Sequence, residues 1–212
     1  MLSCLSEPTS IKLNHMDNMK YKFVVSGAAN MSFCCSEADK KAYEIGREIV
    51  RQGGILITGA TTGVPHMAAK GAKDEGGISI GISPAATYAS HVKSYKLPTD
   101  YFDFIIYSGF DYSGRNLILT KAADAVIIVC GGFGTLNEFT IALEDDKPIG
   151  VLSGTCGASD EIYNLLKNIK DPHHHGAGKM VFSSDPKELI SGLIKVIDTE
   201  RKDVKVGPLV GE

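Results

Sequence analysis

Residues 125–138 read AVIIVCGGFGTLNE, and this stretch decides the fold class. Residues 125–130 are apolar and largely β-branched, which is typical of a strand buried on both faces. Three glycines follow within the next four residues, and a helical-period stretch starts at Thr135. A buried strand that passes through a glycine turn into a helix is typical of parallel sheets, in which helices connect the strands.

The same alternation of short apolar runs and helical-period stretches continues from Tyr21 to the end of the chain. We therefore predict an α/β fold, a doubly wound Rossmann-like parallel sheet of about seven strands with helices on both faces. The expected strands are residues 22–26, 55–58, 78–82, 104–107, 125–130, 149–152 and 179–182. The expected helices span about residues 36–52, 65–75, 114–123, 135–145, 159–169 and 185–197, the first opening with a capping box at Ser36 and Asp39.

No composition shift or internal repeat divides the chain, so residues 21–198 are expected to form a single Rossmann-like nucleotide-binding domain. Residues 1–20 are expected to be a disordered N-terminal tail, and residues 199–212 a polar C-terminal tail. The connection over residues 83–103 is longer than most loops in a compact domain. We expect it to be functional or mobile.

The charge balance argues against a polymeric partner. The 22 Lys and Arg residues and 25 Asp and Glu residues give a net charge of -3. The protein therefore has no net positive field that would attract the phosphates of a nucleic acid. No apolar run approaches the ~18 residues of a membrane helix, and residues 1–20 lack the pattern of a secretory signal. We predict a cytoplasmic protein that binds neither membrane nor nucleic acid polymer.

The cysteines support the same location. They are five in number, which is odd, and none shows C-x-x-C spacing. We expect reduced thiols in a cytosol, with a redox role for the adjacent Cys34 and Cys35 as the alternative. We expect no metal site, because His173, His174 and His175 lie in an exposed loop and point in different directions. His66 and His91 are interpreted as structural, with ligand contact as the alternative.

Glycine is in excess, at 23 of 212 residues, and it clusters where strands end. In a doubly wound sheet, ligands bind beyond the carboxyl ends of the strands, where backbone amides at helix N-termini meet an anion. Thr135 can also cap its helix. The segment GGFGT at residues 131–135, which we call the glycine loop, lacks the terminal G-K-[ST] of a Walker loop. This argues against hydrolysis of a nucleoside triphosphate with a P-loop. The candidate phosphate-binding residues are Ser26, Gly27, Gly59, Thr61, Thr62, Gly63, Gly109, Gly131, Gly132, Phe133, Gly134 and Thr135.

Two charged residues flank the glycine loop. Arg115 stands at a helix start just after the expected strand 104–107, where a guanidinium can grip phosphate or stabilise a leaving group. Glu138 lies three residues beyond Thr135, just after the glycine loop. We interpret both as catalytic, and the alternative for Glu138 is a partner of the helix dipole alone. Tyr107, Phe110 and Tyr112 flank Arg115 and could stack a base, although aromatic residues at a strand end more often simply pack.

These motifs occur in one order that resembles a known family. Arg115 is followed by Ala-Asp-Ala at 123–125 and by GGFGTLNE at 131–138. Upstream, GGILITG at 53–59 and GGISIGISP at 76–84 extend the likeness over roughly residues 21–170. The pattern resembles the LOG family of lysine-decarboxylase-like proteins, the cytokinin phosphoribohydrolases, within the superfamily that includes molybdenum-cofactor carrier proteins.

The resemblance implies a phosphoribohydrolase that splits the N-glycosidic bond of a nucleoside 5′-monophosphate such as AMP, without a cofactor. The glycine loop would hold the phosphate, and Glu138 would stabilise an oxocarbenium-like ribose or orient water. Arg115 would assist the departing base. The family likeness also implies a homodimer or higher homo-oligomer.

Two departures from the LOG pattern support a second hypothesis. Asn116 stands where LOG proteins have lysine, and Cys130 stands where they have proline. The Arg-Asn pair looks more like the carrier branch, which implies a non-catalytic carrier with a bound nucleotide or molybdenum-cofactor pterin. A dehydrogenase is disfavoured, because no acidic residue ends the expected strand 55–58 to hold a ribose hydroxyl.

Overall fold

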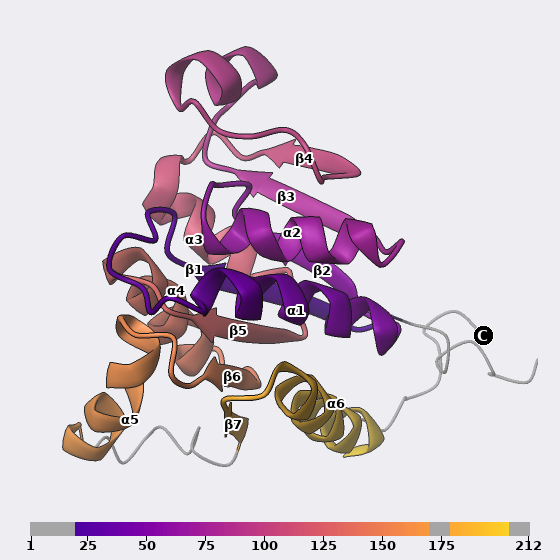
Figure 1. Ribbon diagram of the computed structural model, residues 1–212, viewed down its shortest axis with the longest axis vertical. Coiled ribbons are helices and arrows are strands. Elements are labelled where there is room, and N and C mark those ends of the chain that lie inside the picture. Colours follow the sequence, from indigo (N-terminus) through magenta and orange to yellow (C-terminus); the bar gives the residue numbers. More distant parts are fainter. Residues whose placement is uncertain (1–19, 170–178, 204–212) are drawn as a thin grey trace, which may run out of the picture.

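The computed structural model describes residues 20–169 and 179–203, and its centre is a sheet of seven parallel strands (Figure 1). The strands lie in the order β4-β3-β2-β1-β5-β6-β7. This confirms the predicted parallel sheet, with strand ends shifted by no more than one residue. The strands are β1 (Lys22–Gly27), β2 (Ile55–Thr58), β3 (Ser79–Ser83), β4 (Phe104–Tyr107), β5 (Ala125–Val129), β6 (Ile149–Leu152) and β7 (Met180–Ser183).

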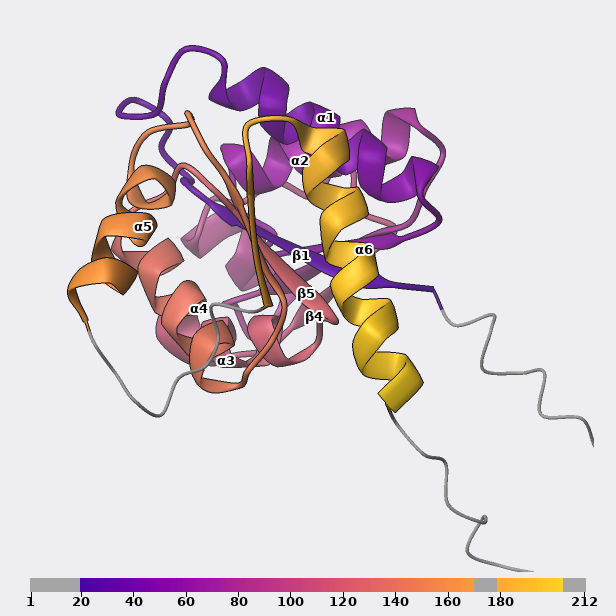
Figure 2. The ribbon, with the colours of Figure 1, turned by 90° about the horizontal axis from the view of Figure 1, so that it is seen from below.

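Helices cover both faces of the sheet, as Figure 2 shows in a view from below. One apolar core lies between the sheet and α1, α2 and α6, and a second lies between the sheet and α3, α4 and α5. The strands therefore bury apolar side chains on both sides, which is why β5 reads as an unbroken apolar run. The helices are α1 (Ala38–Arg51), α2 (Val64–Asp74), α3 (Asp111–Lys121), α4 (Phe133–Glu144), α5 (Ala158–Asn168) and α6 (Pro186–Asp203).

Two predicted helix caps are wrong. α1 begins at Ala38, and its N-cap Glu37 makes no side-chain cap bond, so Ser36 and Asp39 form no capping box. The main chain closes that turn instead, since the Ala38 amide donates to the Cys35 carbonyl at 3.0 Å. α4 begins at Phe133 with Gly132 as N-cap, so Thr135 lies inside the first turn and does not cap it.

Two helices are longer than their sequence pattern indicates. α3 begins at Asp111, ahead of the expected start at Gly114. α6 continues to Asp203, so residues 199–203 extend the helix beyond the predicted boundary of the domain.

Among residues 20–169 and 179–203, none of the helices has the length and apolar character that a bilayer crossing requires. The N-terminal tail, the three adjacent histidines and residues 204–212 lie outside the described residues.

A buried histidine anchors the centre of the long connection between β3 and β4 through two hydrogen bonds. It contains a π-helical turn, η2 (Ser90–Ser94), and His91 in this turn is fully buried. His91 Nε2 donates to the Pro98 carbonyl at 2.8 Å, which leaves Nδ1 to accept from the Ser83 hydroxyl at 2.8 Å. His91 therefore has a structural position.

The strand order creates a crevice beside β1. From β1 the chain proceeds outward through β2, β3 and β4 on one side, and through β5, β6 and β7 on the other. β1 pairs directly with β5, with Gly27 opposite Val129 at the carboxyl ends. Helices that follow the two strands leave in opposite directions at such a switch point, so an open crevice remains there.

Candidate functional site

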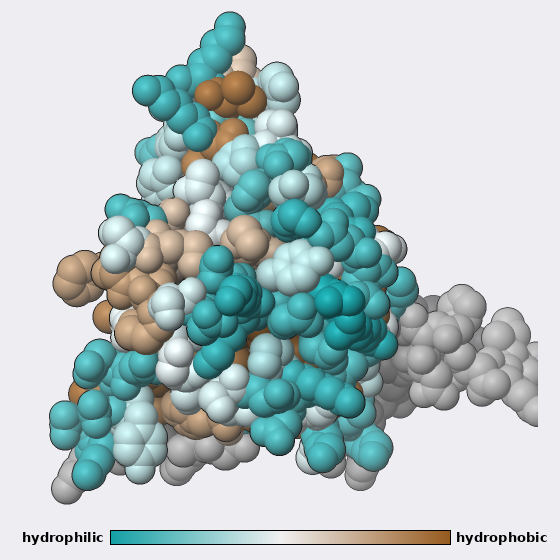
Figure 3. Space-filling model, in the orientation of Figure 1, coloured by the Kyte–Doolittle hydropathy of each residue, from teal (hydrophilic) through white to brown (hydrophobic). Residues whose placement is uncertain are grey.

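A pocket of about 260 Å³ opens at this switch point. Its walls come from the loops after β1, β2 and β5 and from the N-terminal halves of α3 and α4. In Figure 3 the surface around these loops, on the left, is tan to brown, whereas the surface over α1 and α2 is mostly teal. The lining residues are Gly27, Ala28, Ala29, Asn30, Phe33, Thr61, Tyr112, Arg115, Asn116, Gly132, Gly134, Thr135 and Glu138.

The pocket brings together seven residues expected from the sequence: Gly27, Thr61, Arg115, Gly132, Gly134, Thr135 and Glu138. Ser26 and Gly59 lie directly behind its wall, where each contacts one of the two charged residues. The remaining candidates lie outside the lining.

Those remaining candidates shape the surrounding loops. Gly109 lies away from the pocket, where its amide donates to the Ala85 carbonyl at 3.0 Å. Phe133 is 90% exposed. Thr62 donates its hydroxyl to the Ala29 carbonyl at 3.0 Å, and Gly63 is the N-cap of α2. Gly131 lies beneath the pocket wall, because a Cβ there would be 2.3 Å from Thr135 Oγ1.

Glu138 is the centre of a buried polar cluster. Its Oε2 accepts a short hydrogen bond from the Ser26 hydroxyl at the end of β1. Its Oε1 lies 3.6 Å from Arg115 Nη1, and the side chains of Arg115 and Glu138 are only 6% and 8% exposed. Such a pair is not explained by a helix-dipole contact, which needs no burial and no partner on another strand.

Asn116 also faces Glu138. In one amide orientation, Asn116 donates to Asn137 Oδ1 at 2.9 Å. In the reversed orientation, it donates to Glu138 Oε1 and to the Tyr112 carbonyl, each at 2.9 Å. We adopt the second orientation, because it places a donor rather than a carbonyl oxygen against the carboxylate. Glu138 is then held by donors from β1 and α3.

Gly59 gives Arg115 its position. A Cβ at residue 59 would lie 1.8 Å from Arg115 Nη1 and 2.7 Å from Cζ, so the guanidinium occupies the space that a side chain would take. Arg115 Nε is buried and has no hydrogen-bond partner among the described residues. A buried donor of this kind is normally satisfied, so an acceptor on a ligand in the pocket would complete its bonding.

Burial shifts the protonation of this pair. It raises the pKa of Glu138 above its usual value, against the opposing effects of the Arg115 cation and of the Ser26 hydrogen bond. Burial also lowers the pKa of Arg115, while Glu138 and Tyr112 act in the other direction. A carboxyl group whose pKa is raised by burial in a pocket is a candidate for proton exchange with a bound ligand.

This shift predicts a pH dependence for any reaction that needs the Glu138 carboxylate. As the pH is lowered, activity should fall when Glu138 takes up a proton. This should happen at a pH above ~4.3, the unperturbed pKa of glutamate. Ser26→Ala removes a hydrogen bond to the charged form, so it should move this acid limb to higher pH. The measurement is kcat/KM against pH for both proteins. An acid limb that stays in place in Ser26→Ala would show that Glu138 does not set it.

The N-terminus of α4 faces the pocket with free amides. Its first intrahelical bond joins the Leu136 amide to the Gly132 carbonyl at 2.9 Å, and Gly132 makes no side-chain cap bond. The amides of Gly134 and Thr135 precede that bond, so they have no intrahelical partner. No heavy atom within 4 Å faces the Cβ position of Gly134. Free amides and open space here suit a phosphate or carboxylate.

The loop after β1 contributes lining residues that the sequence analysis missed. Ala29, Asn30 and Phe33 line the pocket although they follow the Ser26-Gly27-Ala28 strand end, and no motif marks them. The only signal was the run of small residues continuing past Gly27. Asn116 stood out only as a departure from a family pattern, and the structure places it on Glu138.

The expectation of reduced thiols is wrong for four of the cysteines. Cys34 is bonded to Cys130, and Cys35 is bonded to Cys156, with sequence separations of 96 and 121 residues. The count and spacing of cysteines could not show this, because the partners meet only when the carboxyl ends of β1, β5 and β6 come together. Cys4 lies outside the described residues.

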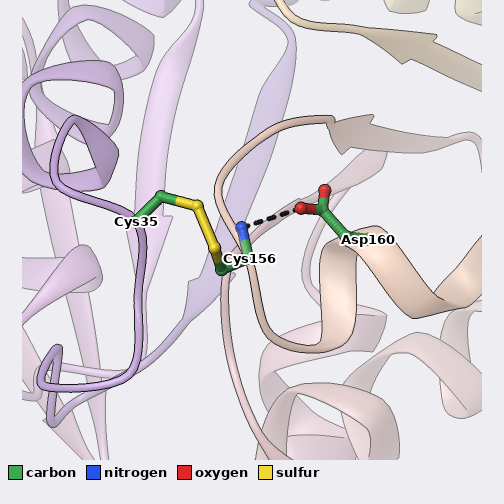
Figure 4. A group of neighbouring side chains, drawn as sticks. All are labelled: Cys35, Cys156 and Asp160. Atoms are coloured by element: carbon green, nitrogen blue, oxygen red, sulfur yellow. Dashed lines mark hydrogen bonds between the residues drawn. A yellow bond between two sulfur atoms is a disulfide. The ribbon is translucent and has the colours of Figure 1, made fainter.

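One group in the described part of the chain has the residue types of a metal site: Cys35, Cys156 and Asp160 (Figure 4). The disulfide occupies both sulfur atoms. The Asp160 oxygens accept from the Gly154 amide at 2.8 Å and from the Cys156 amide at 3.0 Å. Asp160 thus caps the turn before α5, and the group is explained without a metal.

Comparisons with known proteins agree with this architecture. An uncharacterized protein of Archaeoglobus fulgidus is 34% identical over 131 residues, which cover 62% of this chain and 81% of that protein. The molybdenum cofactor binding protein of the phototrophic bacterium Rippkaea orientalis is 28% identical, with a TM-score of 0.65. The molybdenum cofactor carrier protein of Chlamydomonas reinhardtii is 27% identical, with a TM-score of 0.67. Each of these two matches covers 85% of this chain and 99% of the other.

These likenesses support the LOG-like superfamily that the sequence motifs indicated, without selecting its LOG branch. The model of the SLOG cluster4 family matches residues 20–190, which include all seven strands and the helices α3 and α4 that carry Arg115 and Glu138. The chain belongs to the SLOG cluster4 family.

Proposed function

We propose that the pocket binds a nucleoside 5′-monophosphate and that the protein hydrolyses its N-glycosidic bond. The observation that carries this proposal is the Glu138 carboxylate in the pocket wall, on a side chain that is 8% exposed. A buried carboxylate close to an anion site opposes the binding of phosphate and costs free energy to desolvate. Its position is useful where positive charge develops, as it does on the ribose during glycosidic cleavage.

The pocket offers a group for each part of the reaction. The amides of Gly134 and Thr135 would hold the phosphate, and Glu138 would stabilise the oxocarbenium-like ribose or orient water. The bond between C1′ and the base nitrogen breaks with its electron pair leaving on the base. Water adds its oxygen to C1′, and its proton passes to the base. Arg115 would stabilise the departing base through its unsatisfied Nε–H.

A second candidate function is a carrier for a phosphorylated pterin such as the molybdenum cofactor. Its support is the 27–28% identity to two proteins named for binding or carrying that cofactor. The same amides of α4 would hold the phosphate of the pterin. In this case Glu138 would position Arg115 and Asn116 against the pterin ring, and no bond would be cleaved.

The two candidates differ in product. The purified protein is incubated with AMP, GMP, CMP and UMP, and free base and ribose 5-phosphate are separated by chromatography. Release of both products in equal amounts supports the hydrolase. Tight binding of a phosphorylated pterin, with no base released from any monophosphate, would overturn the hydrolase in favour of the carrier.

We also propose that the chain forms a homodimer or higher homo-oligomer through its exposed apolar side chains beside β4. Phe104 and Ile106 on this edge strand are 52% and 47% exposed, and Leu117 and Ile118 on α3 are 46% and 36% exposed. Exposed apolar side chains in such number on an edge strand and on the helix that follows it are typical of an interface. Sedimentation measures the state directly. A cytoplasmic location, and the absence of a polymeric nucleic acid partner, stay predictions.

A further inference from the structure

The loop after β1 serves both the pocket and the disulfides. We call residues 28–37 the latch loop; it is the indigo segment on the left of Figure 1. Its N-terminal part, residues 28–33, supplies Ala28, Ala29, Asn30 and Phe33 to the pocket wall. Its second half contains Cys34 and Cys35. A change at the cysteines therefore acts on the same short loop that encloses the ligand site.

Both disulfides attach this loop to neighbouring strand ends. Cys34 is bonded to Cys130, which immediately precedes the glycine turn at the N-terminus of α4. Cys35 is bonded to Cys156 in the turn between β6 and α5, as Figure 4 shows. The two covalent bonds thus tie the latch loop to the strand end that leads into the glycine turn of the pocket and to the turn before α5.

Apart from these bonds, the latch loop is weakly held. The Val64 amide and the Thr62 hydroxyl bond the carbonyls of Ala28 and Ala29, at 2.9 and 3.0 Å. Beyond them, Met31 packs against the core, and the Cys35 amide donates to the Thr155 carbonyl at 3.2 Å. Most of the loop is exposed, including Phe33 at 50%. Segments with little buried apolar surface open easily when a cross-link is removed.

We propose that the two disulfides form a redox latch on the pocket, which a protein dithiol of the thioredoxin class opens and a small-molecule disulfide such as oxidised glutathione closes, accepting the two electrons and two protons that each re-formed bond releases. Each disulfide accepts two electrons and two protons, while the two thiols of the reductant become a disulfide. The freed latch loop leaves the pocket wall incomplete, and ligand affinity falls. The affinity part of this inference rests on the proposed function, because it requires that the pocket bind a nucleotide.

The exposure of the sulfur-bearing residues sets an order of opening. Cys35 and Cys156 are both partly exposed, whereas Cys130 is fully buried. Cys34 is partly exposed as well, so a thiolate can approach both cysteines of the Cys35–Cys156 bond but only one cysteine of the Cys34–Cys130 bond. The bond between Cys35 and Cys156 is therefore reduced first. The bond between Cys34 and Cys130 then follows, once the loop has loosened.

The test uses the full chain, oxidised or treated with increasing dithiothreitol. Alkylation and mass spectrometry identify the freed thiols, and we expect Cys35 and Cys156 before Cys34 and Cys130. Limited chymotrypsin digestion measures cleavage at Phe33, which should accelerate on reduction. Calorimetry with AMP should show binding roughly 10-fold weaker after reduction and restored after reoxidation.

Two double variants serve as matched controls. Cys35→Ser with Cys156→Ser should already show faster cleavage at Phe33 without reductant, and Cys34→Ser with Cys130→Ser tests the inner bond alone. Circular dichroism confirms that each variant is folded. An unchanged rate of cleavage at Phe33 after all four thiols are free would overturn the latch. If oxidised protein fails to bind AMP, the proposed function fails instead, and the cleavage assay still decides the latch.

Discussion

Glu138→Gln is expected to lower the rate of base release from AMP by roughly 10³-fold. Glutamine keeps the volume of the side chain and an oxygen that can accept from Ser26, but it removes the negative charge that would face the ribose. Binding of phosphate should be retained or improved, because the carboxylate no longer opposes an anion in the pocket. The measurement pairs single-turnover base release with calorimetry using inorganic phosphate.

The control for this variant is Glu161→Gln, which removes one carboxylate from the exposed side of α5. It should leave base release unchanged. Removing one partner of a buried ion pair costs about 3–5 kcal/mol, so the thermal stability of Glu138→Gln must be measured beside its activity. Base release at the wild-type rate in folded Glu138→Gln would exclude this carboxylate from the chemistry.

Gly59→Ala should also damage the site strongly, although residue 59 has no side chain of its own. The added Cβ would lie 1.8 Å from Arg115 Nη1, so the guanidinium must leave its place beside Glu138. Breaking that buried pair costs about 3–5 kcal/mol, which lowers the unfolding temperature by roughly 6–20 °C in a domain of this size. Base release should fall by at least about 10²-fold, because the displaced cation no longer faces the leaving group.

A double variant separates this clash from a general loss of packing. With Arg115→Ala in the background, the methyl group of Gly59→Ala has free space. The double variant should therefore be about as stable as Arg115→Ala alone, and the two effects should be far from additive. Scanning calorimetry of the wild type, both single variants and the double variant completes the cycle. Additive losses of stability would place the cause outside Arg115.

The strands were predictable because each forms from a local pattern. The apolar runs in β1, β2 and β5 are buried on both faces, so they stand out as unbroken segments of β-branched residues. Gly132 and Gly134 marked the turn into α4 for the same local reason. Helix starts were harder, since the main chain of the preceding loop, and no side-chain cap, closes the first turns of α1 and α4.

The site was predictable in its parts but not in its contacts. Arg115 and Glu138 were singled out by their places after strand ends and by a family pattern. Nothing local indicated that Glu138 bonds Ser26, which lies 112 residues earlier, or that Gly59 makes room for Arg115. The adjacent Cys34 and Cys35 misled for the same reason, because their partners are 96 and 121 residues away.

The sequence by itself determined the alternation of strands and helices and the small residues at the strand ends, because these depend on side-chain period and on backbone freedom within a few residues. Only the tertiary structure decided which strand ends become neighbours. The order of the sheet places β1 between β2 and β5, and this one arrangement brings together the carboxylate, the guanidinium and the latch loop. Contacts between segments about a hundred residues apart depend on strand order, which no short stretch of sequence specifies.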